Sequence, residues 1–172
     1  MVCFFAGSNA QQPPSADSIL KEAIKTASAE NKNVFIIFHA SWCIWCHKMD
    51  SSMNDKNCKI LFDNNYIIRH LTVSESKNKK HLENPGAFGL LARYKGVDDG
   101  IPFWVIFDSS GKLLADSRMK VESAGLNTQE KNTGCPATKE EVKYFISVLK
   151  KTSSLSASQL SVIEKRFREN DN

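Results

Sequence analysis

The feature that most constrains the fold is a short apolar run that leads into a pair of cysteines. Val34–Phe38 is wholly apolar and rich in β-branched and aromatic side chains. Such a run is typical of a strand that is buried on both faces of a sheet. Trp42-Cys43-Ile44-Trp45-Cys46-His47 follows closely, and a helical pattern begins within it. The chain is therefore predicted to hold both cysteines at a strand-to-helix junction of an α/β domain.

The composition limits the classes of protein to consider. The 172 residues suffice for one domain of ordinary size, and 41% hydrophobic with 24% charged residues is typical of a globular chain. The net charge of +4 is too weak and too scattered to indicate nucleic-acid binding. No apolar run approaches the roughly 18 residues that span a bilayer. We expect a monomer without a membrane span.

The N-terminal residues 1–14 are expected to stand outside the fold. An apolar stretch precedes Ser8 and Ala10, whose small side chains fit a signal-peptidase site before Gln11. The basic start of a signal is missing and the apolar stretch is short, so we interpret the segment as the tail of a secretory signal. The alternative is a disordered N-terminus. A secretory signal would place the mature protein in an oxidising, extracytoplasmic space such as the periplasm.

The remaining pattern predicts one domain over residues 15–151, with strands and helices alternating and then an antiparallel hairpin. This order favours a central mixed sheet with helices on both faces. Residues 74–85 are interpreted as a loop and residues 118–137 as a long irregular connection. The expected helices are 15–31, 45–66 with a kink near 54–57, 86–94 and a helix after Thr138, and the expected strands are 34–38, 67–73, 102–107 and 112–116.

Residues 152–172 are expected to add a linker and a C-terminal helix. Thr138 and Ser156 each precede a Glu or Gln by three residues, which is the pattern of a capping box at a helix start. Leu160, Ile163 and Phe167 then form a narrow apolar stripe on the last helix.

The spacing of Cys43 and Cys46 suits redox chemistry. Two cysteines three apart at a helix start can close a small disulfide, and the helix N-terminus favours the thiolate of the first. In such motifs the thiol pKa falls from about 8.5 to roughly 3.5–7.5. Cys43 is then expected to be the exposed nucleophile, and Cys46 the thiol that resolves the mixed disulfide.

The chain resembles the thioredoxin family, and more narrowly its exported members with a WCxWC motif and an added C-terminal helix. The resemblance covers most of residues 15–150. It implies a thioredoxin-like fold and thiol–disulfide exchange on protein thiols, with a redox partner protein and no metal or organic cofactor. It also implies that Ile101-Pro102 holds a cis peptide bond opposite the disulfide. The matching stretches are Val34–Phe38, Ala40–Cys46, Tyr94, Gly100–Pro102, Phe103–Phe107 and Gly111-Lys112.

The chain departs from the family pattern beside the cysteines. Many members carry a buried acidic residue six positions before the first cysteine, where this chain has Ile37. His39 stands where a tryptophan is common, and it is either a proton relay or a packed imidazole. His47 either favours the Cys43 thiolate through its charge or lies on a solvated helix face.

Aromatic side chains near the motif suggest how a polypeptide would bind. Trp42 and Trp45 are candidates for an apolar contact surface, and Ile101-Pro102 for a backbone edge that an extended substrate pairs with. We expect the Trp42 ring to pack inward and the Trp45 ring to be largely exposed.

The other two cysteines of the domain are expected to be free. Cys58 lies at an apolar-periodic position and is interpreted as a buried, inert thiol. Cys135 lies in a loop, and its pairing with Cys58 remains an alternative because connectivity cannot be read from sequence.

Other readings of the motif stay open. Cys43-Ile44-Trp45-Cys46-His47 also matches the C-x-x-C-H pattern of c-type haem attachment, although the buried strand before it suits a packed core better. Zinc would need two ligands beyond the thiolates, and no second C-x-x-C or H-x-x-x-H pair occurs. The pair could also be a structural disulfide, and the domain a non-catalytic binding module for a polypeptide or membrane-bound partner.

Overall fold

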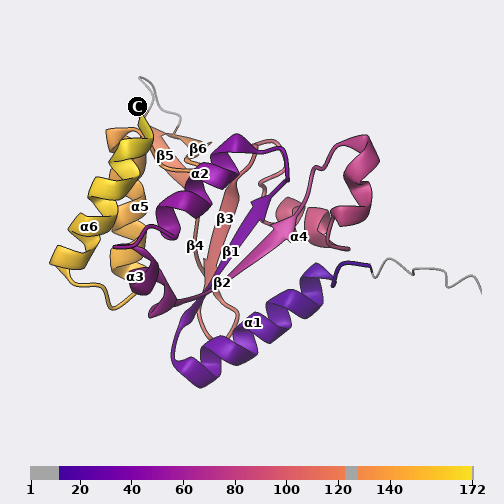
Figure 1. Cartoon of the computed structure of the whole chain (residues 1–172), viewed down its shortest axis with the longest axis horizontal. Helices are drawn as coiled ribbons and strands as arrows, with labels where there is room; N and C mark the ends of the chain where they lie inside the picture. Colours follow the sequence, from indigo (N-terminus) through magenta and orange to yellow (C-terminus); the bar gives the residue numbers. More distant parts are fainter. Residues whose placement is uncertain (1–11, 123–127, 172) are drawn as a thin grey trace, which may run out of the picture.

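The central sheet is built around the apolar strand that precedes the cysteines. In the computed structural model, which describes residues 12–122 and 128–171, four strands lie in the order β2-β1-β3-β4. β1 pairs with β2 in parallel and with β3 antiparallel, and β3 pairs with β4 antiparallel (Figure 1). The predicted mixed sheet is confirmed. The strands are β1 (Asn33–His39), β2 (Tyr66–Thr72), β3 (Phe103–Phe107) and β4 (Leu113–Asp116).

The side chains of β1 alternate between two apolar cores. Phe35 and Ile37 belong to one core, and Val34, Ile36 and Phe38 to the other. All five are almost fully inaccessible to solvent, which confirms a strand buried on both faces. β1 is also paired on both edges, with β2 and with β3.

Helices α1 (Ala16–Glu30) and α4 (Ala87–Arg93) cover one face of the sheet. Ser15 caps α1 by accepting a hydrogen bond from the Ser18 amide, and Asn31 ends it in the left-handed conformation. The expected helix over residues 15–31 is therefore confirmed.

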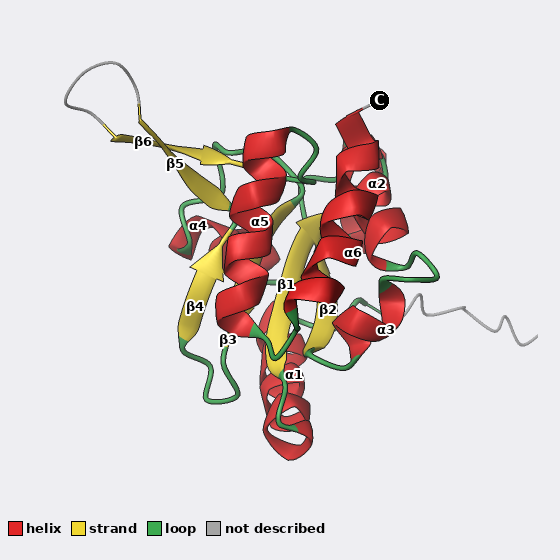
Figure 2. Ribbon diagram, turned by 90° about the vertical axis from the view of Figure 1, so that its left-hand side faces the viewer, coloured by secondary structure: helices red, strands yellow, loops and turns green. Residues whose placement is uncertain are grey.

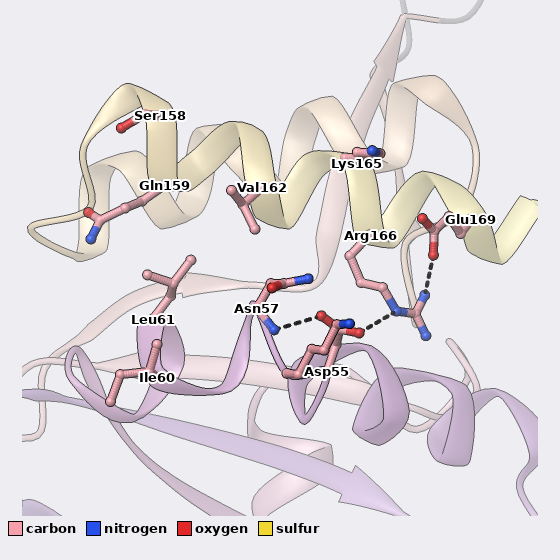
Figure 3. A pocket seen from close by; sticks show the side chains of 11 residues that line it. Asp55, Asn57, Ile60, Leu61, Ser158, Gln159, Val162, Lys165, Arg166 and Glu169 are labelled. Atoms are coloured by element: carbon pink, nitrogen blue, oxygen red, sulfur yellow. Dashed lines mark hydrogen bonds and ion pairs between the residues drawn. The ribbon is translucent and has the colours of Figure 1, made fainter.

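The opposite face carries α2 (Ile44–Met53), α3 (Lys59–Asp63), α5 (Lys139–Thr152) and α6 (Ala157–Arg168), as Figure 2 shows. Both predicted capping boxes are present, at Thr138 and Ser156. The stripe of α6 is buried, and the Phe167 ring centre lies 4.9 Å from that of Phe145. α6 also lies opposite the segment that joins α2 to α3, across a hollow that both of them line (Figure 3). A short 3₁₀ turn, η2 (Glu169–Asp171), follows α6.

Three expectations about irregular segments were wrong. The helix expected over residues 45–66 is two helices, and Tyr66 begins β2. The loop over residues 74–85 contains a 3₁₀ helix, η1 (Lys77–Leu82). The connection over residues 118–137 contains a hairpin of β5 (Arg118–Glu122) and β6 (Thr128–Asn132).

The hairpin escaped prediction because it pairs only with itself. The sequence of β5, RMKVE, alternates over only five residues, and that of its partner β6, TQEKN, is wholly polar, so the pair gives no sustained period-2 signal. Its pairing rests on backbone hydrogen bonds, supported by an ion pair of Arg118 Nη1 with Glu130 Oε2 at 3.0 Å.

The expected signal segment, residues 1–14, falls mostly on residues 1–11, which lie outside the described residues. In the part of the chain that the structure describes, none of the helices is both long and apolar enough to cross a bilayer.

Substitution of Phe167 tests how much α6 contributes to the stability of the fold. Its ring is fully buried against Phe62 and Phe145, so Phe167→Ala should lower the free energy of unfolding by about 3–5 kcal/mol. Denaturant unfolding measures the loss. Val162→Ala, on the exposed side of α6, should change stability by less than about 0.5 kcal/mol. Equal effects of the two substitutions would contradict this packing.

Candidate functional site

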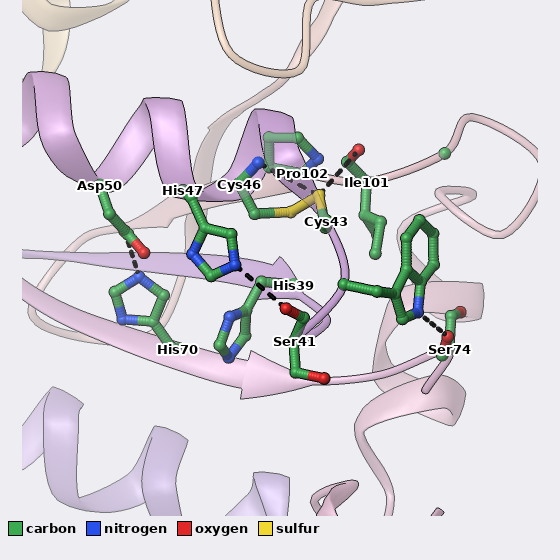
Figure 4. The surroundings of a disulfide bond; sticks show 12 residues. His39, Ser41, Cys43, Cys46, His47, Asp50, His70, Ser74, Ile101 and Pro102 are labelled. Carbon is green, nitrogen blue, oxygen red and sulfur yellow. Dashed lines mark hydrogen bonds and ion pairs between the residues drawn. A yellow bond between two sulfur atoms is a disulfide. The ribbon is translucent and has the colours of Figure 1, made fainter. Parts of the chain in front are cut away.

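A disulfide joins Cys43 and Cys46 across the first turn of α2, with their Cα atoms 5.2 Å apart (Figure 4). Cys43 is the N-cap of the helix, and the Cys46 amide donates to Cys43 Sγ at 3.1 Å. The unpaired amides at a helix start favour negative charge. This position therefore suits a thiolate at Cys43 when the pair is reduced.

The disulfide is covered, which corrects one expectation. Cys43 is only 3% exposed in this oxidised form, whereas an exposed nucleophile was expected. Ala40, directly after β1, clusters with the two cysteines, and Ile101 from the opposite loop packs against this cluster. The helix start sits directly on the sheet, so the side chains of neighbouring segments close over it.

The wall opposite the disulfide is the segment before β3. The Ile101–Pro102 peptide bond is cis, and the Ile101 carbonyl oxygen lies 3.5 Å from Cys43 Sγ. Pro102 is buried, and Ile101 is half-buried. The structure thus brings Ile101-Pro102 to the cysteine pair, 55 residues further along the chain.

Asn132, which the sequence did not single out, holds this wall. Its side-chain amide lies within hydrogen-bond distance of three carbonyl oxygens, at 3.0 Å from Asp99, 3.2 Å from Gly100 and 3.2 Å from Pro102. Asn132 ends β6, so the hairpin missed by sequence analysis positions the loop that faces the disulfide.

Exposed apolar side chains surround the covered pair. Trp45 is 46% exposed, as expected, and Lys48 Nζ lies 4.5 Å from the centre of its ring. Trp42 is 56% exposed, so the expectation that it packs inward was wrong. Its ring nitrogen donates to the Ser74 carbonyl oxygen at 2.9 Å, which keeps the indole on the surface. Ile44, between the cysteines, is 72% exposed.

A hollow of about 410 Å³ adjoins the pair. Its lining includes Trp45, Ile101 and Pro102, together with Cys135 and Glu141. A polypeptide side chain next to a reacting cysteine would fit in a hollow of this size and position.

Three of the four histidines lie near this end of the sheet (Figure 4). His47 is exposed, and its Nε2 lies 3.1 Å from the Ser41 carbonyl oxygen. His39 is half-buried, with Nε2 at 3.2 Å from Thr72 Oγ1 and its ring centre 5.0 Å from that of His70. His70 in turn contacts Asp50 Oδ1 at 2.7 Å.

The surroundings of His39 lower its pKa below the ordinary value. Burial is the largest cause, and the neighbouring His70 acts in the same direction, while the Asp50 and Glu75 carboxylates oppose both. His39 is therefore a neutral imidazole at neutral pH.

Glu75 is a buried carboxylate that the sequence analysis left in a loop. It accepts hydrogen bonds from the Ser41 amide at 2.5 Å and the Ser41 hydroxyl at 2.9 Å. Burial acts to raise the pKa of Glu75, but these hydrogen bonds and Lys79 outweigh it, so the pKa lies below its ordinary value. Glu75 thus fixes the residue that precedes the tryptophan of the motif.

Ile37 is fully buried within the core on the α2 side of the sheet. A side chain without ionisable atoms thus occupies the position six residues before Cys43.

Cys58 and Cys135 are both free and buried, which confirms the expectations for them. Burial raises the thiol pKa to about 11 for Cys58 and to about 12 for Cys135. Neither thiol is ionised near neutral pH, so neither competes with the pair in α2 as a nucleophile.

The described residues do not form a metal-binding cluster. Within residues 12–122 and 128–171, no group of three or more His, Cys, Asp or Glu side chains is placed to hold a metal ion. Cys43 and Cys46 are bonded to each other, so in this state neither sulfur is available to zinc or to a haem thioether bond.

Comparison with known proteins identifies the domain. A family model described as thioredoxin-like matches residues 16–109, which is more than half of the chain. Among curated protein sequences, none matches the chain.

Solved structures of similar shape include a disulphide isomerase from Xylella fastidiosa Temecula1, with a TM-score of 0.49 and 21% identity over 67% of this chain and 80% of that one. A DsbH oxidoreductase has a TM-score of 0.47 and 20% identity over 87% of this chain and 92% of that one. The oxidised C-terminal domain of DsbD from Neisseria meningitidis has a TM-score of 0.45 and 20% identity, over 81% and 98%.

The lowered pKa of His39 predicts a pH dependence of stability. The unfolded chain takes up the His39 proton near pH 6.5, and the folded chain only at lower pH. Stability should therefore fall as the pH drops through about 6.5 toward the folded pKa, because the unfolded state binds more protons there. His39→Gln should reduce this loss between pH 7.5 and 5.5, as measured by denaturant unfolding.

The exposed His81 is the matched control for that experiment. His81→Gln should leave the pH profile unchanged. The low pKa of Glu75 affects stability only as the pH falls below about 4.5, outside the chosen window. A wild-type profile that is flat from pH 7.5 to 5.5 would refute the assignment to His39.

Proposed function

Because the chain belongs to the thioredoxin-like family, we propose that it is a thiol–disulfide oxidoreductase acting on protein thiols and disulfides through Cys43 and Cys46. The observation that carries the proposal is the disulfide at the start of α2, with the Cys46 amide directed at Cys43 Sγ. The same arrangement stabilises the thiolate that begins an exchange reaction.

The exchange proceeds in two steps. The reduced Cys43 thiolate attacks one sulfur of a substrate disulfide, and the other substrate sulfur leaves as a thiolate. The Cys46 thiolate then attacks Cys43 Sγ, releases the second substrate thiolate and closes the Cys43–Cys46 disulfide. Two electrons pass to the substrate, whose thiolates take up protons from solvent. A redox partner protein restores the dithiol, and the reverse sequence oxidises a substrate.

Cys46 must lose a proton before the second step, and Ile37 offers no base for it. His39 and His47 are the proposed modulators of this proton and of the Cys43 thiolate. His39 is neutral near pH 7 and contacts His70, while His47 lies one residue beyond Cys46 and reaches back to Ser41. The reaction itself involves only sulfur and protons and needs no metal or organic cofactor.

Trp42, Trp45, Ile101 and Pro102 are the proposed substrate-binding residues. Both tryptophans present exposed ring surface beside the disulfide, which suits extended polypeptides with apolar side chains. The Ile101 carbonyl oxygen next to Cys43 supplies a backbone acceptor at the point of attack.

The working unit is proposed to be a monomer with a redox domain over residues 15–151 and an addition over residues 152–172. An extracytoplasmic location is proposed from the apolar N-terminal residues followed by Ser8 and Ala10. Such a compartment would be compatible with the disulfide of α2 in its oxidised form.

A non-catalytic binding module is the second candidate, and the 3% exposure of Cys43 favours it. A disulfide under such cover could serve as a staple at the helix start, while the exposed tryptophans hold a polypeptide. The two candidates differ in whether the sulfurs exchange.

Substitution of each cysteine separates the two candidates. Cys43→Ser and Cys46→Ser should both abolish the catalysed reduction of insulin by dithiothreitol, because each removes one sulfur of the exchange. Cys46→Ser should accumulate mixed disulfides with protein substrates, and Cys43→Ser should not, as gel electrophoresis under non-reducing conditions would show. Cys58→Ser should keep full activity. If neither α2 substitution changes any thiol assay, the binding module is the correct assignment.

Ile101 should limit access to the disulfide. Ile101→Ala removes the side chain that packs against the sulfurs, so dithiothreitol should reduce the Cys43–Cys46 disulfide several-fold faster. Stopped-flow tryptophan fluorescence follows this reduction. Ile60→Ala, which shortens an exposed side chain on α3, should leave the rate unchanged. An unchanged rate in Ile101→Ala would show that access is controlled elsewhere.

A further inference from the structure

A groove runs along α6 and ends at the redox motif. A hollow of about 680 Å³ lies between α6 and the segment from Asp55 to Leu61 (Figure 3). A second hollow, of about 510 Å³, lies between the end of α6 and the first two turns of α2. Arg166 and Glu169 line both, so the two hollows are adjacent, and together they are here called the α6 groove. Its second hollow reaches Ile44, the residue after Cys43.

The α6 groove offers apolar surface at both ends. Ile60 and Val162 are exposed at the far end, and Ile44 is exposed beside the disulfide. Large apolar side chains that lie close together on a surface commonly mark a site where another chain binds.

The charge of the α6 groove is positive. Lys48, Lys56, Lys165 and Arg166 line it, against two carboxylates. The two carboxylates, Asp55 and Glu169, both lie within 4 Å of Arg166, at 3.9 and 3.8 Å.

The three lysines of the groove remain without a counter-charge. Among the described residues, no carboxylate lies within ion-pair distance of any of them. The Lys48 ammonium lies over the Trp45 ring and near the Asn170 carbonyl oxygen, contacts that leave its charge unneutralised. The groove thus carries a net charge of about +2, half of the +4 of the whole chain.

We propose that the α6 groove binds an acidic segment of the protein substrate, next to the substrate cysteine that reacts with Cys43. This inference rests on the proposed function, and it names the class of substrate. Carboxylates of the segment pair with Lys56 and Lys165, and its apolar side chains contact Ile60 and Val162. α6, which forms one side of the groove, lies outside the residues 16–109 that match the family model, whereas α2 and the segment from Asp55 to Leu61 lie within them.

The length of α6 sets the length of the segment. Twelve helical residues extend about 18 Å, which five or so residues of extended polypeptide would cover. The acidic residues of the substrate are therefore expected within about six positions of its reactive cysteine.

Binding of cysteine-free peptides tests the groove independently of redox activity. Two rhodamine-labelled peptides of about eight residues share leucines and differ only in having glutamates or lysines. Fluorescence anisotropy with the oxidised protein at low ionic strength should show the acidic peptide binding at least about tenfold more tightly. The difference should shrink in 0.5 M salt, because exposed charges are screened there.

Charge reversal locates the binding site. The double variant Lys56→Glu with Lys165→Glu should lose the preference for the acidic peptide. The matched control, Lys21→Glu with Lys25→Glu on α1 across the sheet, changes the net charge equally and should keep it. Equal binding of both peptides, or a preference that survives in the groove variant, would overturn the proposal.

Enzyme kinetics distinguish a loss of substrate binding in the groove from a loss of thiol–disulfide exchange. The reduced groove variant should reduce the neutral bis(2-hydroxyethyl) disulfide at the wild-type rate but lose about tenfold in kcat/KM on a disulfide-linked acidic peptide. A loss on both substrates would refute the role of the groove as a substrate site. A wild-type protein that binds the acidic peptide but reduces neither disulfide would refute the proposed function and retain the groove as a binding site.

Discussion

The fixed end of β1 is the constraint on which the site depends. Buried on both faces and paired on both edges, β1 has no freedom to shift, and only three residues separate it from Cys43. α2 therefore begins at a defined place above the sheet, with the Cys46 amide directed at Cys43 Sγ. A rigid strand thus determines the position of a reactive helix start, which agrees with the general observation that precise sites are built on regular elements.

The same packing explains why the disulfide is covered. Ile101 reaches the sulfurs because β3 is hydrogen-bonded next to β1, and the segment before β3 must pass beside the start of α2. Asn132 then ties that segment to the β5–β6 hairpin through carbonyl oxygens. Access to Cys43 is consequently controlled by the segment before β3 and by Asn132, which holds it. The tendency of Cys43 to ionise is controlled by the start of α2. The two are set by different parts of the chain.

Local patterns in the sequence were enough to predict most of the fold and the place of the cysteine pair in it. The apolar run of β1, the capping residues Thr138 and Ser156, and the C-x-x-C spacing each act over a few residues, so they can be read directly. The burial of Cys43 depends on a side chain 58 residues away, and the exposure of Trp42 depends on one hydrogen bond to Ser74. Contacts of that kind leave no periodic signal in the sequence.

The apolar side chain at Ile37 changes where charge can act on the redox pair. With Ile37 in the core, the ionisable groups that the structure places at the outer side of α2 include His47 and Asp50 on the helix, His39 and His70 on the neighbouring strands, and the lysines along the α6 groove. These groups are half-buried or exposed, so salt and pH reach them more readily than a carboxylate enclosed beneath the disulfide. A bound acidic segment would itself alter the field at α2 by approaching Lys48. If the proposed substrate binding holds, it would therefore be electrostatically linked to thiolate stability through the outer side of α2 and not through its core.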